Sequence, residues 1–297
     1  MSDLATRLAG LSPQKRELLL RRLGGLEAQA APAAPAIPRA PRPADGPARF
    51  PVSFSQLREW ILDRLEPGTP AYNIPGNFRI TGPLSIPDLD RALQEIVRRH
   101  ESLRTTFEAP EYPTNDEPLQ AVAPRLTIRL PVLDLSGLSP ELREAELSRR
   151  VRVELRTGFD LAAGPLLRLR LVRLGPDDSG SDNHAVLFTM HHIISDGWSM
   201  GVFFREIATL YDSFAAGKPS PLPELPVQYP DFAVWQRNRL QGEALEDQIG
   251  YWRRQLAGAP PLLELPTDRP RPPVRSGRGR SVGSSRSGGA PASRRRQ

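Results

Sequence analysis

A short apolar run that ends on two adjacent histidines is the feature that most restricts how this chain can fold. Residues 185–190 (AVLFTM) are typical of a buried strand, and the Asp-Gly pair at 196–197 is typical of a turn. The amphipathic run that follows, 199–214, predicts a helix with Ser199 as its N-cap. The sequence therefore predicts a strand-to-helix corner that carries both histidines.

Elsewhere along the chain the hydrophobic period alternates between those of helices and strands. Stripes and caps predict further helices at 56–65, 87–99 (with Ser85 as its cap), 140–158, 229–240 and 248–256. Further strands are predicted at 103–108, 119–122, 126–133 and 167–171. The turn-rich stretch 175–183 indicates that the strand before it pairs antiparallel with the histidine-bearing strand. This order predicts an α/β (α+β) domain, with a mixed sheet covered by helices.

The corner at 191–197 carries a candidate general base. Adjacent strand residues project to opposite faces, so only one of His191 and His192 can enter a given pocket. An imidazole titrates close to neutral pH and suits proton transfer. The plain structural alternative is that both histidines are hydrogen-bonded core residues and Asp196 belongs to an ordinary turn. A metal site is disfavoured because the chain has no cysteine and no second histidine cluster. A serine hydrolase is disfavoured because Ser195 lacks nucleophile-elbow glycines.

The two ends of the chain differ in composition from its centre. Residues 1–28 predict one amphipathic helix, and residues 29–50 a Pro/Ala-rich linker. Residues 269–297 contain nine arginines and no acidic residue, so the net charge is +6 for the whole chain and −3 without this segment. We expect this basic tail to be disordered and the core to lie within residues 51–268.

Composition also limits the expected partners and location. The basic tail contains no aromatic residue, which predicts no specific nucleic-acid binding. No stretch is apolar and long enough for a membrane span, and the N-terminus has no secretory pattern. The absence of cysteine gives no sign of export through disulfides. A cytoplasmic location without a membrane partner is the expectation.

Four motifs in the central region resemble those of the condensation domains of nonribosomal peptide synthetases. Residues 190–199 (MHHIISDGWS) resemble the HHxxxDG signature of that family, which belongs to a superfamily that includes chloramphenicol acetyltransferase. The other three are SFSQLREW at 53–60, RHESLRTTF at 99–107 and YPDFAVW at 229–235. They follow the family's order, and the resemblance covers about residues 50–268.

The resemblance implies amide-bond formation between two acyl groups held as thioesters on phosphopantetheine arms of carrier proteins. It implies that His192 is the catalytic residue, as proton acceptor or as the group that holds the attacking amine, and that His191 is mainly structural. Asp196 would shape the site with Arg104 as its ion-pair partner, and Gly197 would permit a tight backbone beside the channel. No directly bound cofactor and no metal are expected.

Condensation domains resemble two acetyltransferase-like halves, and the motifs of the C-terminal half have no counterpart here. The chain is thus expected to be a chloramphenicol acetyltransferase-like N-terminal half domain, truncated and inactive alone. Its partners would be peptidyl carrier proteins and neighbouring synthetase modules, and an exposed inner face would favour self-association. Two alternatives remain: an O- or N-acyltransferase of the same superfamily that uses coenzyme A or carrier thioesters, and a non-catalytic remnant that binds partners.

Overall fold

The computed structural model describes residues 36–43, 45–109, 117–176, 180–260 and 262. The chain divides into two compact units, residues 1–246 and 247–297. Helix α8 (Gly242–Gln255) crosses this boundary, and all other described helices and strands belong to the first unit. The leading helix expected within 1–28 and the basic tail 269–297 lie outside the described residues.

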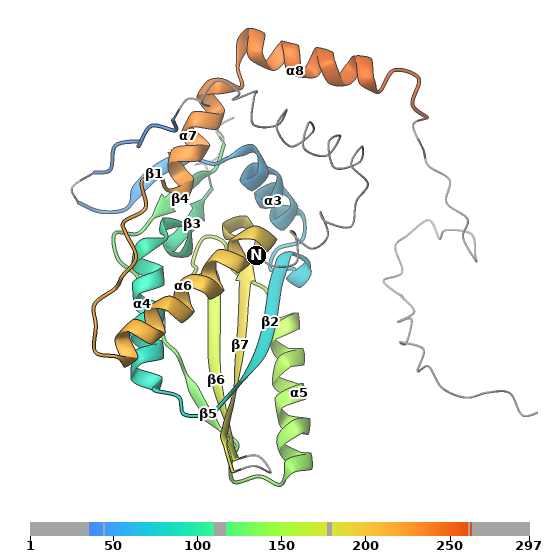
Figure 1. Cartoon of the computed structure of the whole chain (residues 1–297). Coiled ribbons are helices and arrows are strands. Elements are labelled where there is room, and N and C mark those ends of the chain that lie inside the picture. The colour runs from blue at the N-terminus through green and yellow to red at the C-terminus, as the bar shows by residue number, and fades with distance from the viewer. Residues whose placement is uncertain (1–35, 44, 110–116, 177–179, 261, 263–297) are drawn as a thin grey trace, which may run out of the picture. The chain divides into compact units, whose positions relative to one another are not determined.

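A four-stranded mixed sheet forms the centre of the first unit (Figure 1). Its order is β2 (Asn73–Thr81), β7 (Asp182–His191), β6 (Leu167–Pro176) and β5 (Val132–Asp134). Strand β7 pairs antiparallel with both of its neighbours, whereas the short β5 runs parallel to β6. The predicted hairpin between the last two long strands and the predicted mixed α/β sheet are therefore confirmed.

Helices cover both faces of this sheet, as the alternation of apolar side chains along β6 requires. Leu167, Leu169 and Leu171 join the main core under α4 (Ile86–Arg99) and α6 (Gly197–Ala215). Val172 and Leu174 turn to the other face and join a smaller core with α5 (Pro140–Arg156). Full burial of each such side chain contributes roughly 1.5–3 kcal/mol. The central strands are thus fixed between two helical layers.

A second, antiparallel sheet supports the end of the molecule where the histidines lie. It contains β1 (Ala48–Pro51), β4 (Leu119–Val122) and β3 (Thr105–Glu108), in that order. Helix α7 (Tyr229–Arg239) packs against it through Val234. The remaining elements are helix α3 (Phe54–Leu65) and the 3-10 turns η1 (Pro70–Tyr72), η2 (Glu101–Arg104) and η3 (His192–Ile194).

Local differences from the sequence prediction have simple physical causes. Of the strand predicted at 126–133, only the part beginning at Val132 forms a ladder. Ile128 is nevertheless buried in the main core, and the Gln94 side chain bonds its backbone N–H and carbonyl. The apolar pattern there marked burial rather than strand pairing. The strand predicted from 103 begins at Thr105, because the four residues before it form η2.

The proline-rich segment before residue 51 is partly docked rather than a free linker. The Ala40 N–H donates a 2.9 Å hydrogen bond to Asp231. Arg42 lies 2.7 Å from Glu101 and 2.5 Å from Asp231. An extended segment has no internal hydrogen bonds, so its polar groups are free to pair with α7 and η2. The folded region therefore begins upstream of the predicted boundary at residue 51.

Among the described residues, no helix has the length and apolar character needed to cross a lipid bilayer.

Candidate active site

The corner that carries the two histidines is held by its own backbone and side chains. Strand β7 ends at His191, and the chain then makes one 3-10 turn before it enters α6. The Ile193 N–H donates a 3.0 Å hydrogen bond to Nδ1 of His191. The Ser195 hydroxyl donates to the His191 carbonyl at 3.2 Å. These bonds close the turn that separates one imidazole from the next.

His191 points into the protein interior. The residue is 1% exposed, and its ring lies 6.2 Å from the Tyr72 ring and 6.1 Å from the Phe159 ring, centroid to centroid. Burial, helped by the neighbouring His192, lowers the pKa of His191 to about 4. Because Nδ1 accepts a hydrogen bond, the proton of the neutral ring is on Nε2. His191 is therefore a neutral core residue at neutral pH.

His192 opens into a cavity of about 640 Å³. Its side chain is 48% exposed, and its Nδ1 lies 3.3 Å from Oε1 of Glu59 on α3. The Glu59 side chain is 16% exposed, and burial raises the pKa of its carboxyl group against the opposing influence of His192 and Arg58. This contact occupies Nδ1 and leaves Nε2 as the ring nitrogen available to a ligand.

The walls of this cavity come from segments that are far apart in the sequence. Helix α3, the end of α4 with η2, the corner itself, the first turn of α6 and residues 225–232 all contribute. Trp198 stands at this cavity with 85% of its surface exposed. Tyr229, at the start of α7, bonds through its hydroxyl to Oγ of Ser53 at 2.9 Å. The cavity thus brings together residues of all four sequence motifs.

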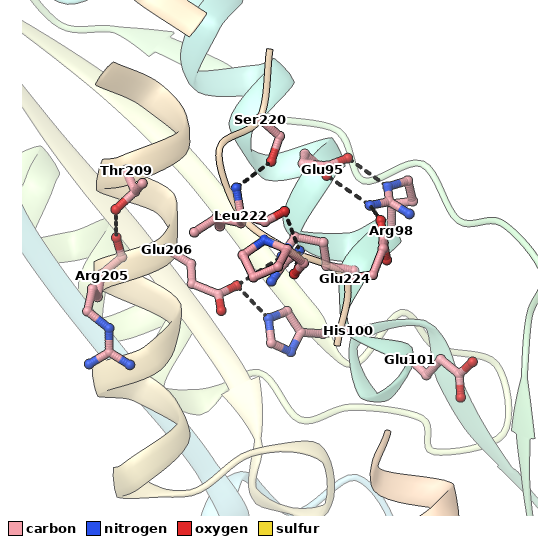
Figure 2. Close-up of polar contacts among 12 residues, drawn as sticks. Glu95, Arg98, His100, Glu101, Arg205, Glu206, Thr209, Ser220, Leu222 and Glu224 are labelled. Carbon is pink, nitrogen blue, oxygen red and sulfur yellow. Dashed lines mark hydrogen bonds and ion pairs between the residues drawn. The ribbon is translucent and has the colours of Figure 1, made fainter. Parts of the chain in front are cut away.

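A second imidazole–carboxylate pair lies beside the same cavity, which His100 lines (Figure 2). Nε2 of His100 lies 2.8 Å from Oε2 of Glu206 on α6. The same oxygen is 3.3 Å from Nε of Arg99, whose side chain is 2% exposed and also donates to the Pro223 carbonyl at 2.8 Å. Burial alone would raise the pKa of Glu206, but the bonds from His100 and Arg99 lower it. This cluster ties the end of α4 to α6.

Asp196 and Arg104 both lie in the described part of the chain and do not pair with each other, so the predicted ion pair is wrong. Arg104 donates to the Ala123 carbonyl and lies 3.6 Å from Glu101, and burial lowers the pKa of its guanidinium. Asp196 is exposed and is itself the N-cap of α6, in place of the predicted Ser199. Its Oδ1 accepts the Ser199 N–H at 2.7 Å and the Ser199 hydroxyl at 2.6 Å, which lower the pKa of Asp196.

The reason for this difference is local. The first N–H groups of a helix have no partner within the helix, and an aspartate just before it satisfies them without any distant cation. Gly197 has an ordinary negative φ, and a Cβ at this position would meet no atom of the described chain within 4 Å. The tight backbone approach predicted for Gly197 therefore has no counterpart inside the described chain.

Sequence reasoning missed Glu59 because the motif that SFSQLREW at 53–60 resembles, S-x-x-Q-x-R-x-W, allows any residue at position 59. A signal was present in the spacing. Gln56, the motif glutamine, lies three residues earlier on the same helix face and donates from Nε2 to the Ile193 carbonyl at 3.4 Å. A polar residue one turn along from Gln56 is placed to reach the same corner.

The condensation-domain family model matches residues 48–286, which is most of the chain. This chain belongs to the condensation-domain family. The match begins at β1 and continues beyond residue 268, where the sequence resemblance was expected to stop. The expected family is therefore confirmed, with wider limits.

Curated relatives of this condensation domain are much longer proteins. It is 46% identical over 234 residues to a linear gramicidin synthase protein of Brevibacillus parabrevis, covering 79% of this chain and 4% of that protein. It is 45% identical over 275 residues to phosphinothricin tripeptide synthetase PhsC of Streptomyces viridochromogenes, covering 92% of this chain and 24% of that protein. The chain thus spans less than a quarter of the length of either relative.

Solved structures confirm the fold. The X-domain in complex with OxyB from teicoplanin biosynthesis is 31% identical with a TM-score of 0.67, covering 84% of this chain and 51% of that one. The starter condensation domain of rhizomide synthetase RzmA is 20% identical with a TM-score of 0.62, covering 72% of this chain and 49% of that one. The condensation-domain chain spans about half the length of each of these structures.

Proposed function

We propose that this chain supplies the base-bearing part of a site that forms an amide bond between two carrier-bound acyl thioesters. The observation that carries the proposal is the separation of the two histidines. His192 opens into the cavity, whereas His191 is sealed in the core. The family membership and the synthetase relatives support the same reaction class.

In this reaction the α-amine of the acceptor attacks the carbonyl carbon of the donor thioester. A C–N bond forms, and the excess proton of the amine passes to Nε2 of His192. The C–S bond then breaks, and the proton passes to the departing phosphopantetheine thiolate, which restores the neutral imidazole. A positioned base of this kind contributes typically about 10²–10⁴-fold, and alignment of the two tethered reactants contributes further.

Carrier proteins and neighbouring synthetase modules are the proposed partners. The cavity volume of about 640 Å³ lies in the range of small-molecule sites and suits the end of an acylated phosphopantetheine arm. The arm belongs to the carrier, so the chain itself binds no resident cofactor in this proposal. Both carriers would act in the cytoplasm.

The test compares His192→Ala with His191→Ala in the full chain fused to the C-terminal half of a synthetase condensation domain. Donor and acceptor carriers are loaded with aminoacyl groups, and dipeptidyl carrier is followed by mass spectrometry. His192→Ala should melt normally and lose about 10²-fold or more in rate. His191→Ala should melt at a lower temperature and retain turnover in its folded fraction. Normal turnover by folded His192→Ala contradicts the assignment.

A non-catalytic binding role is the second candidate, and one comparison favours it. The 31% identical X-domain is a structural relative solved in complex with another protein, OxyB. In this case the fused chain would bind partner proteins equally well with and without His192 and would form no dipeptide. Measuring binding and product in the same variants separates the two functions.

A further inference from the structure

Helix α3 presents two polar side chains to the histidine corner from one face. Gln56 holds the corner backbone through the Ile193 carbonyl, and Glu59 contacts the His192 imidazole. The helix start is itself fixed by a reciprocal cap between Ser53 and Gln56, with bonds of 3.0 and 3.1 Å. One rigid element therefore sets both the position of the turn and the neighbour of its exposed imidazole.

The two imidazoles of the corner have different neighbours at Nδ1. Nδ1 of His191 accepts the Ile193 N–H, which puts the ring proton on Nε2. Nδ1 of His192 lies 3.3 Å from Oε1 of Glu59, and an ionised carboxylate at this place favours the ring proton on Nδ1. The Nε2 lone pair of His192 is then free to take a proton from a ligand.

The surroundings of Glu59 give no sign that this residue stabilises the fold. Its Oε2 is inaccessible to solvent and has no hydrogen-bond partner among the described residues. Burial raises the pKa of the carboxyl group, so its ionisation costs more in the folded chain than in water. A carboxylate held at such a cost beside a cavity is typical of functional sites.

We propose that Glu59 is a positioning residue for His192, which orients the ring through Nδ1 and makes Nε2 the basic nitrogen of the site. The proposal rests on the proposed function for its catalytic meaning, but its structural content is testable without turnover. Glu59 would act on His192 alone and would not touch the reacting amine.

The first test is nuclear magnetic resonance of the full chain labelled with ¹⁵N in histidine. The chain has four histidines, so long-range proton–nitrogen spectra assign each tautomer by single substitutions. His192 should be in the Nδ1–H form when neutral. Glu59→Leu should shift it toward the Nε2–H form, whereas Glu59→Gln, whose amide oxygen can still accept, should shift it less. Both variants should melt at or above the wild-type temperature.

Other charged or polar groups near Glu59 and His192 also influence these two residues, so the test needs control variants. Arg58 on α3, His191 on β7, Asp196 at the start of α6 and Tyr229 on α7 all act electrostatically on Glu59 or His192. Asp196→Asn removes the other nearby acidic charge without touching the Nδ1 contact. It should leave the His192 tautomer unchanged, as should Glu206→Gln, which alters the carboxylate beside His100.

The second test is condensation by the fused chain described above. Glu59→Gln should lose about tenfold in kcat with little change in KM for the loaded carriers. A residue that only supported the fold would change the melting temperature instead.

The proposal is overturned if His192 has the same tautomer in folded Glu59→Leu as in the wild type, whatever the rates. If the fused wild-type chain forms no dipeptide, the proposed function fails, and the spectra alone still decide whether Glu59 orients His192.

Discussion

At the scale of single residues, His191 and His192 show how one step along the chain changes the chemistry of a side chain. His191 is the last residue of β7, and its ring enters the core between Tyr72 and Phe159. His192 begins the 3-10 turn, and its ring reaches the cavity. Burial removes the first from proton transfer near neutral pH, and exposure leaves the second able to exchange protons with a ligand.

The buried imidazole predicts a specific pH dependence of stability. The pKa of His191 falls from an ordinary value of 6.5 to about 4 on folding, so the unfolded chain binds the proton more tightly. The free energy of unfolding should therefore fall as pH drops through the window from about 6.5 to about 4, by at most about 3 kcal/mol.

His191→Asn keeps an acceptor for the Ile193 N–H and removes the titrating ring. Urea unfolding at several pH values should show a shallower decline in this variant than in the wild type between pH 6.5 and pH 4. Parallel curves for the two proteins would contradict the assigned shift.

At the scale of elements, the start of α6 is stabilised locally. Asp196 accepts two hydrogen bonds from Ser199, while Arg104 is engaged with Glu101 and the Ala123 carbonyl. The acidic residue of the HHxxxDG pattern thus sets the first turn of the helix that leaves the corner. The position of that helix in turn fixes Trp198 and the Glu206–His100 contact at the cavity.

Asp196→Ala should lower the free energy of unfolding by about 1 kcal/mol through loss of the cap. Asp196→Asn should lose less, because asparagine also caps helices, although it gives up a charge at the helix N-terminus. The measurement is urea denaturation of both variants and of the double variant with Arg104→Ala. The two single effects on the free energy of unfolding should add, because Asp196 and Arg104 share no contact. A coupling energy above about 0.5 kcal/mol would show that the two residues interact and would contradict this prediction.

At the scale of the first unit, the segment before β1 connects α7 to η2. Asp231 is fully buried, and it accepts hydrogen bonds from the Ala40 and Gln228 N–H groups as well as from Arg42. Arg42 also pairs with Glu101, the start of η2. Burial alone would raise the pKa of Asp231, but the bonds from Arg42, Gln228 and Ala40 lower it.

Arg42→Ala should destabilise the chain by about 3 kcal/mol near neutral pH, since it leaves a buried carboxylate without its cation. A carboxyl group with a lowered pKa contributes stability that is lost as pH falls through its folded pKa, so the difference from the wild type should shrink in acid. Thermal melting at pH 7 and pH 3 measures this. Arg39→Ala, which changes an exposed arginine of the same segment, is the control and should melt like the wild type.

The condensation-domain chain spans about half of the solved chains that it resembles, and this predicts its behaviour alone. Under the proposed function, two tethered reactants must be held in attack geometry for the amide bond to form. The chain by itself should form no dipeptidyl carrier from loaded carriers, whereas its fusion to a C-terminal half should. Sedimentation of the lone chain should also show self-association through exposed apolar surface. His192-dependent product from the lone chain would contradict this prediction.

The sequence by itself determined the family and most of the helices and strands, but it did not predict β1 or β2. Local apolar periods, caps and turn residues are properties of neighbouring positions, so α4 and α5 were predictable to within two residues at each end. The strands β6 and β7 were predicted too short, by five residues at the end of β6 and three at the start of β7. The corner and the separation of its histidines were also predicted, although His192 stands in a 3-10 turn rather than in the strand that the prediction assumed.

Only the tertiary structure decided which side chains meet. The contact of Glu59 with His192 joins residues 133 positions apart, and the docking of Arg42 on Asp231 joins residues 189 positions apart. The spacing of Gln56 and Glu59 places both on one face of α3, but which residues that face meets depends on how α3, η3 and α7 pack. The predicted Asp196–Arg104 ion pair, which does not form, is the opposite case. The Asp196 carboxylate caps the N-terminus of the adjacent helix and needs no distant cation.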